Sequence, residues 1–255
     1  MVCMEGANSH KVGRVRSGLW SVSRVRTLSH HGAVRHGTRT AGSTKALTIA
    51  SMLVTTLSMP SLTTGCGGDE PRSLGGIVRD EPLSVGSVAV TDVTDTGEYA
   101  THDGVFEMVA PTGRLLVVYF GYTNCPDLCP TTLAYVRAAK RDLGDDGDLV
   151  DLAMVTVDPD RDTPEVLNGY LSSFTDRFHA LQPADVEELE SAENAFLASS
   201  SIVIGDDGAI EVGHSSTAYV VDSSGEVLVE WPFGVDKDLM AEDLRILLDR
   251  TSKQS

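Results

Sequence analysis

Residues 115–133 read LLVVYFGYTNCPDLCPTTL and join an apolar strand to a helix through a loop that carries two cysteines. The run at 115–120 has no polar residue, which is typical of a strand buried on both faces of a sheet. Apolar side chains at helical spacing predict a helix at 130–143. The cysteines, Cys125 and Cys129, are therefore expected where the carboxyl end of a central strand meets a helix, which is the thioredoxin-like placement.

Alternating elements continue on both sides of this segment. Two short strands at 87–90 and 105–108 predict an amino-terminal hairpin. Further elements follow the cysteines: strands at 148–157, 201–204, 209–212, 218–221 and 226–230, and helices at 163–174, 184–198 and 237–250. The order predicts an α/β fold, a thioredoxin-like mixed sheet covered by helices, with an amino-terminal hairpin extension.

Charge is distributed unevenly along the 255 residues, whose net charge is -17. Residues 1–45 hold eight Lys and Arg and one acid, whereas 12 basic and 36 acidic residues follow Lys45. Such an acidic body repels polyanions, so we expect no nucleic-acid binding. We assign the folded domain to residues 83–252, and the basic residues 1–45 to a disordered extension or a start placed too far upstream.

Residues 46–66 have the pattern of an export signal. The stretch 46–64 is uncharged, follows Lys45 and precedes Gly65 and Cys66. The cysteine predicts a lipoprotein anchor in which Cys66 carries the lipid. The alternative is an uncleaved amino-terminal membrane anchor, since 19 uncharged residues are near the minimum that spans a bilayer. Either alternative places the domain outside the cytoplasm, after a Gly- and Pro-rich linker at 67–82.

The cysteine pair has three possible uses: a structural disulfide, a redox-active dithiol, or two ligands of a metal. A disulfide between Cys125 and Cys129 closes a very short loop, which limits its stabilising effect. A helix amino terminus favours both thiolates, because its N–H groups and dipole lower a thiol pKa. The last two uses remain open on this evidence.

One histidine favours the metal site. The domain contains His102 and His179, which we expect at the surface, and His214, which follows the turn residue Gly213. In a thioredoxin-like sheet the loop that precedes strand 218–221 faces the cysteine loop. Two thiolates and one imidazole suit copper, as Cu(I) or Cu(II), whereas a closed structural zinc site takes four protein ligands.

Three motifs in this order closely resemble the Sco/SenC family: FGYTNCPDLCPTTL at 120–133, VTVDPDRDTPEVL at 155–167 and GHSSTAYVVDSSGEV at 213–227. The resemblance implies a thioredoxin-like copper chaperone for assembly of the binuclear copper centre of cytochrome c oxidase. Its partners would be the copper-bearing oxidase subunit and a copper donor protein. The ligands it implies are Cys125, Cys129 and His214; Asp158, Pro159 and Asp162 match a further family block.

Two residues depart from the family pattern. Gly213 stands where an aspartate often precedes the ligand histidine, and Asn124 stands where histidine is common. Neither departure removes an implied ligand. A second function also stays open, in which Cys125 and Cys129 form the redox pair of a dithiol reductase that keeps the partner's copper-binding cysteines reduced.

Overall fold

The computed structural model describes residues 72–99 and 104–253. The predictions for residues 1–45, for the export signal at 46–66 and for lipidation of Cys66 lie outside the described residues, as does His102. No helix within the described ranges is both long enough and apolar enough to cross a membrane.

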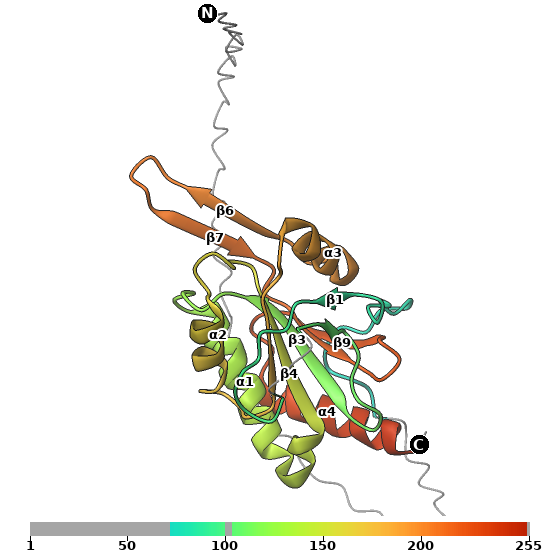
Figure 1. Ribbon diagram of the computed structural model, residues 1–255. Helices are drawn as coiled ribbons and strands as arrows, with labels where there is room; N and C mark the ends of the chain where they lie inside the picture. The colour runs from blue at the N-terminus through green and yellow to red at the C-terminus, as the bar shows by residue number, and fades with distance from the viewer. Residues whose placement is uncertain (1–71, 100–103, 254–255) are drawn as a thin grey trace, which may run out of the picture. The chain divides into compact units, whose positions relative to one another are not determined.

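Within these residues a mixed sheet of five strands has the order β5-β4-β3-β8-β9 (Figure 1). The strands are β3 (Leu115–Gly121), β4 (Val150–Thr156), β5 (Phe178–Leu181), β8 (Ala218–Val221) and β9 (Val227–Trp231). β4 runs parallel to β3 and β5, while β8 is antiparallel to β3 and β9. Every residue of β3 and β4 is buried, and the continuous apolar run predicted this for β3.

Four α-helices of the described chain are α1 (Leu128–Asp142), α2 (Pro164–Leu171), α3 (Val186–Phe196) and α4 (Lys237–Ser252), and a short 3₁₀ helix, η1 (Gly144–Leu149), precedes β4. α2 begins where predicted. The Thr163 hydroxyl accepts a hydrogen bond from the Val166 N–H. Pro164 is the first helical residue, a position where the missing N–H of proline leaves no hydrogen bond unmade. α1 packs against α4. Phe196 of α3 packs against Phe120, with ring centroids 5.5 Å apart.

Helices therefore cover both faces of the sheet. Successive residues of a strand point to opposite faces, so Tyr119 points away from Phe120 and its partner Phe196. Tyr119 lies on the side of α1, since its ring and the Cys129 sulfur both approach the same face of Gly121. This confirms the predicted α/β class with a mixed sheet.

Two antiparallel pairs stand beside the main sheet. β1 (Ala89–Val90) and β2 (Phe106–Glu107) form the predicted amino-terminal hairpin. β6 (Ser200–Ile204) and β7 (Ile210–His214) form a second hairpin, turned by Gly208 at a φ of 80° that glycine adopts without strain. Figure 1 shows this ribbon extending beyond α3.

The expectation that His179 lies at the surface is wrong. His179 belongs to β5, a strand that the sequence did not reveal, and is 8% exposed. Its Nδ1 lies 3.0 Å from Oδ2 of Asp92, and its ring stacks on Tyr99 at a centroid distance of 4.8 Å. The residue is buried because the chain around the β1–β2 hairpin covers this edge of the sheet, where Asp92 bridges to Leu181.

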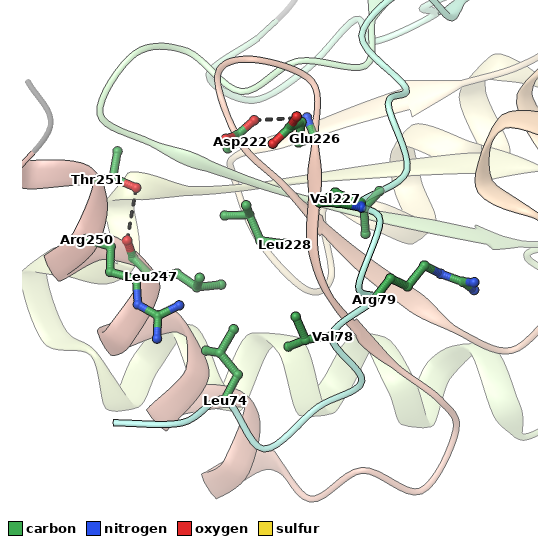
Figure 2. Close-up of a pocket in the computed structure, with 11 residues that line it drawn as sticks. Leu74, Val78, Arg79, Asp222, Glu226, Val227, Leu228, Leu247, Arg250 and Thr251 are labelled. Carbon is green, nitrogen blue, oxygen red and sulfur yellow. Dashed lines mark hydrogen bonds between the residues drawn. The ribbon is translucent and has the colours of Figure 1, made fainter. Parts of the chain in front are cut away.

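The segment predicted as a linker, 67–82, is described from Arg72 onward and packs on the domain. The backbone N–H groups of Gly75 and Gly76 donate to the Asp243 carboxylate of α4 at 2.7 and 3.0 Å. Ile77 pairs with Glu230 of β9 through two hydrogen bonds of 2.9 Å. Apolar side chains of the segment and of the domain line one pocket (Figure 2): Leu74, Val78, Leu228 and Leu247.

Candidate metal centre

The cysteines stand at the junction of β3 and α1, as predicted. Cys125 lies in the connecting loop and Cys129 lies in the first turn of α1, where its N–H donates to the Cys125 sulfur at 3.4 Å. Both are free thiols. Cys125 is 8% exposed and Cys129 is completely buried. The pair therefore presents one sulfur near the surface and one beneath it.

Gly121, the last residue of β3, makes room for the buried sulfur. A Cβ atom at this position would lie 3.0 Å from the Cys129 sulfur and 2.8 Å from the ring of Tyr119. Both distances are shorter than a side-chain carbon tolerates, so a larger residue would displace the sulfur or the ring. The close approach explains why the strand ends in glycine immediately before the cysteine loop.

His214 comes from the end of β7 and meets the cysteines from the other side. Its Nε2 lies 3.4 Å from the Cys129 sulfur, and its Nδ1 lies 2.9 Å from the backbone oxygen of Ser215. A carbonyl oxygen only accepts hydrogen bonds, so Nδ1 carries a proton, and Nε2 is the ring nitrogen that faces the sulfur.

Two tyrosines that the sequence did not single out frame the imidazole. Tyr119 and Tyr122 meet the ring of His214 edge to face, at centroid distances of 6.1 and 5.7 Å. Tyr122 in turn lies 6.0 Å from the guanidinium carbon of Arg161, whose side chain pairs with Asp158. These contacts limit rotation of the imidazole and connect it to the loop after β4.

That loop also holds the cysteine loop in place. Asp162 is fully buried, and its Oδ2 accepts hydrogen bonds from the Thr123 N–H at 3.0 Å and the Thr156 hydroxyl at 2.6 Å. Its Oδ1 accepts from the Thr123 hydroxyl at 2.5 Å. The motif at 155–167 therefore contributes a carboxylate that positions the approach to Cys125.

The two thiols differ in acidity. Burial would raise the pKa of Cys125, but hydrogen bonds from the backbone N–H groups of Cys129, Asp127 and Leu128 outweigh it, and the pKa lies below its ordinary value. Burial raises the pKa of Cys129 to about 12, and the neighbouring Cys125 sulfur adds to the shift. The prediction that the helix terminus favours both thiolates is right for Cys125 and wrong for Cys129.

The two departures from the family motif leave the ligand atoms in place. Gly213 has open space on one side, where a Cβ atom would meet only the Ser201 hydroxyl oxygen at 3.0 Å. The Ser215 carbonyl supplies the partner for the imidazole that an aspartate could otherwise provide. Asn124 precedes Cys125 and is exposed to solvent.

The donor atoms of Cys125, Cys129 and His214 all lie within 4.8 Å of one another. Among residues 72–99 and 104–253 they are the one group of three histidine, cysteine, aspartate or glutamate side chains whose spacing suits a metal ion. The donor set, two sulfurs and one imidazole nitrogen, is soft and small in number. It fits a soft ion of low coordination number better than Mg²⁺ or Ca²⁺, which take oxygen ligands.

Comparison with known proteins bears on the same part of the chain. An SCO2-like protein of Rickettsia typhi is 31% identical over 135 residues, which cover 52% of this chain and 66% of the relative. An SCO2-like protein of Rickettsia prowazekii is 35% identical over 121 residues, covering 46% and 57%. The chain thus spans about three-fifths of the length of these curated relatives.

A solved structure of Bradyrhizobium japonicum ScoI with copper bound superimposes with a TM-score of 0.51 at 27% identity, covering 65% of this chain and 96% of that one. This likeness supports the thioredoxin-like interpretation of the five-stranded sheet. The SCO1/SenC family matches residues 97–249, a stretch that begins before β2, ends within α4 and includes both cysteines and His214. With the sheet, the cysteine loop and the histidine hairpin all inside that match, the chain belongs to the SCO1/SenC family.

Proposed function

We propose that this protein binds one copper ion through Cys125, Cys129 and His214 and serves assembly of the binuclear copper centre of cytochrome c oxidase. The observation that carries the proposal is the convergence of these donors within 4.8 Å, with 3.4 Å between the Cys129 sulfur and Nε2 of His214. Three donors spaced evenly around one ion at about 2.0–2.3 Å lie about 3.5–4.0 Å from one another. The most distant pair of donors therefore needs to approach by about 1 Å.

Copper is cargo in this proposal, and the residues favour both uptake and release. Uptake displaces thiol protons, above all from Cys129, whose pKa of about 12 keeps it protonated without a metal. Release is favoured because Cys125 is slightly exposed and His214 is half-buried, whereas Cys129 is completely buried. An incoming ligand from the copper-bearing oxidase subunit could replace the outer two donors first.

The same proposal places the domain outside the cytoplasm. The uncharged stretch at 46–64 and the Gly65-Cys66 pair support export followed by lipid attachment at Cys66. The anchored domain would receive copper from a donor protein and meet the oxidase subunit at the membrane. The acidic body supports attraction of cationic partners rather than of nucleic acid.

The asymmetry of the thiols favours a second candidate function, reduction of the acceptor's cysteines. The lowered pKa and slight exposure of Cys125 suit it to attack a disulfide of the partner, forming a mixed disulfide and releasing one partner thiolate. Cys129, after losing its proton, would then attack Cys125, releasing the second partner thiolate and leaving a Cys125–Cys129 disulfide. This disulfide could not bind copper until it is reduced.

A copper titration of the reduced full-length protein tests the first function. The wild type should bind one ion per chain, and His214→Ala should weaken binding at least tenfold, because it removes one of three ligands. His179→Ala is the matched control: it removes the imidazole that pairs with Asp92 and should leave copper affinity unchanged once folding is verified by circular dichroism.

Equal copper affinity of the wild type and His214→Ala would remove the basis of the copper proposal. The reductase proposal predicts a different result for the same variants. A dithiol reductase should tolerate His214→Ala and lose activity with either Cys125→Ser or Cys129→Ser, measured as thiol release from an oxidised acceptor.

A further inference from the structure

Three cations gather on one face of α1, at the end of the helix away from the cysteines. Arg137, Lys140 and Arg141 stand at positions i, i+3 and i+4, so their side chains are neighbours, and like charges at this spacing destabilise a helix. Basic residues are scarce here, since only 12 follow Lys45 against 36 acids. The carboxyl end of the helix dipole favours cations, but it amounts to about half an elementary charge. It therefore cannot balance all three.

None of these cations has a carboxylate within ion-pair distance among the residues that the structure describes. The Arg137 guanidinium donates to the backbone oxygen of Ser173 at 3.4 Å, and the Lys140 amine donates to the Thr175 hydroxyl at 3.1 Å. Lys140 is only 9% exposed, and burial lowers the pKa of its amine to about 8. A counter-ion at this point would compensate for the water that the ammonium group has lost.

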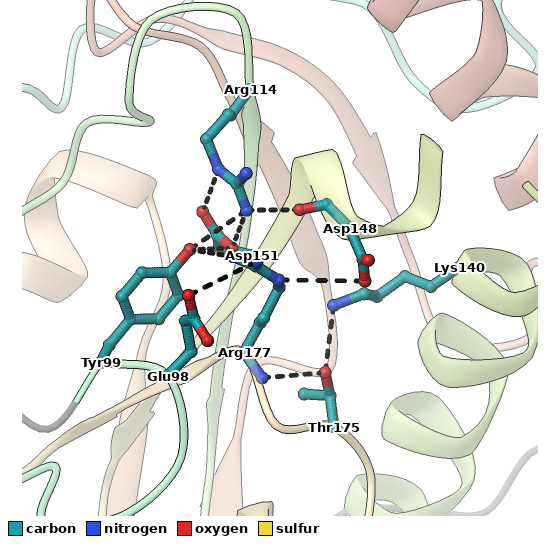
Figure 3. A network of polar contacts seen from close by, with 8 residues as sticks. All are labelled: Glu98, Tyr99, Arg114, Lys140, Asp148, Asp151, Thr175 and Arg177. Atoms are coloured by element: carbon teal, nitrogen blue, oxygen red, sulfur yellow. Dashed lines mark hydrogen bonds and ion pairs between the residues drawn. The ribbon is translucent and has the colours of Figure 1, made fainter. Parts of the chain in front are cut away.

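The three side chains line a cavity of about 530 Å³ together with Arg177, which precedes β5. Figure 3 shows Arg177 paired with Glu98 and Asp148, two acids whose side chains are 56% and 80% exposed. Asp176 is the third acid of the cavity wall. Four cations and three acids of the described chain therefore line the cavity, which makes its wall positive in a body with 36 acids and 12 bases.

A phosphate group has the chemistry that this cavity lacks. Guanidinium groups bind phosphate oxygens in pairs, and a lysine ammonium adds a compact charge. A phosphate monoester carries about 1.5–2 negative charges near pH 7, which offsets more of the three unpaired cations than the single charge of a carboxylate. The volume lies within the range of about 300–1,000 Å³ typical of small-molecule sites, so the cavity has room for a larger molecule that bears the phosphate.

We propose that this cavity binds a phosphate group through Arg137, Lys140 and Arg141, supplied by a free phosphate compound or by a phospholipid headgroup. The site is separate from the metal centre, because Arg137 and Arg141 follow Cys129 by 8 and 12 residues, or about 12–18 Å along the helix. Phosphate binding therefore requires no copper, and the inference stands independently of the proposed function.

Isothermal titration calorimetry of the metal-free, full-length protein with inorganic phosphate at constant ionic strength tests the inference. The wild type should bind one phosphate per chain, and Arg137→Gln/Arg141→Gln should weaken binding at least tenfold. Both residues are exposed, so this double variant should fold, which circular dichroism verifies. Arg245→Gln/Lys253→Gln is the matched control: it removes the same charge from exposed positions in and after α4 and should keep the wild-type affinity for phosphate.

A second titration distinguishes the two sources of the phosphate. Glycerophosphoglycerol is the soluble headgroup of phosphatidylglycerol. If the wild type binds it more tightly than inorganic phosphate, the cavity belongs to a phospholipid, and the reverse order assigns it to a free phosphate compound. Either order supports the proposal when the double variant loses the binding. Equal affinities of the wild type and the double variant for both compounds, or binding of neither compound, would overturn the phosphate site and leave the copper function untouched.

Discussion

Oδ2 of Asp162 lies 3.0 Å from the backbone nitrogen of Thr123, two residues before Cys125. The loop after β4 thus fixes the loop after β3, and the geometry of the thiols depends on a carboxylate that contacts neither of them. Asp162 is fully buried, and its three hydrogen bonds compensate for the loss of water around its charge.

Asp162→Asn should lower both stability and copper affinity. An amide offers one acceptor oxygen where the carboxylate offers two, so at least one donor among Thr123 and Thr156 loses a good partner. The expected loss of unfolding free energy is about 1–3 kcal/mol, measured by urea denaturation. The exposed Asp160 provides a control, since Asp160→Asn leaves these bonds intact. Affinity equal to that of the wild type would mean that the cysteine loop keeps its geometry without the carboxylate.

Gly121→Ala should weaken copper binding without removing a ligand. The added methyl group would lie 3.0 Å from the Cys129 sulfur and 2.8 Å from the Tyr119 ring, and both belong to the buried interior. Overpacking of this kind costs about 1–3 kcal/mol, and displacement of the sulfur should lower copper affinity several-fold in a competitive titration.

Gly169→Ala is the control for this substitution. A Cβ atom at Gly169 meets nothing within 4 Å, and the residue lies within α2, where alanine favours the helix. The control should be as stable as the wild type or slightly more stable, with unchanged copper affinity. If Gly121→Ala behaves in the same way, the close approach at Gly121 has no functional consequence.

The sequence predicted the parts of the site that depend on local pattern. The apolar run of β3 and the cysteines that follow it locate the metal centre, and Thr163-Pro164 locates the start of α2. His214 required one further step, the expectation that the chain before β8 faces the cysteine loop. The distance of 3.4 Å between Cys129 and His214 supports that step.

Features that arise from packing between distant segments were not predictable. β5 was not predicted from the sequence, so His179 was placed at the surface although Asp92 and Tyr99 bury it. The acidity of Cys129 was misjudged for the same reason. A helix terminus can be recognised in sequence. The burial that raises the pKa of the Cys129 thiol depends on packing against Gly121 and the sheet, which the sequence does not show.

Cys66→Ser should release the protein from the membrane fraction, because the substitution removes the sulfur to which the proposed lipid is attached. The measurement is the distribution of the protein between membrane pellet and soluble fraction after cell disruption. Cys3→Ser is the matched control, since it removes a cysteine that precedes the export signal. Retention of Cys66→Ser in the pellet would instead support the uncleaved anchor at 46–64.

Lys140 makes stability depend on pH at the far end of α1 from the cysteines. Burial lowers its pKa from 10.5 to about 8, Asp151 and Asp148 oppose the shift, and Arg177 and Arg114 add to it. Figure 3 shows these groups together, with the Lys140 amine donating to the Thr175 hydroxyl at 3.1 Å.

The sign of the effect follows from the number of bound protons. Between pH 8 and 10.5 the unfolded chain keeps the Lys140 proton and the folded protein has lost it, so the free energy of unfolding rises with pH. Below pH 8 both states are protonated, and the folded protein bears the full cost of the buried charge. Lys140→Met removes this dependence.

The free energy of unfolding of the wild type relative to Lys140→Met should therefore increase by up to about 3 kcal/mol from pH 7 to pH 10. Other groups titrate equally in both proteins, so the difference isolates Lys140. Lys253→Met, at the exposed end of α4, should show no comparable trend. A wild-type advantage that stays constant across this range would mean that the Lys140 amine holds its proton in the folded protein as firmly as in the unfolded chain, with Asp151 and Asp148 compensating for its burial.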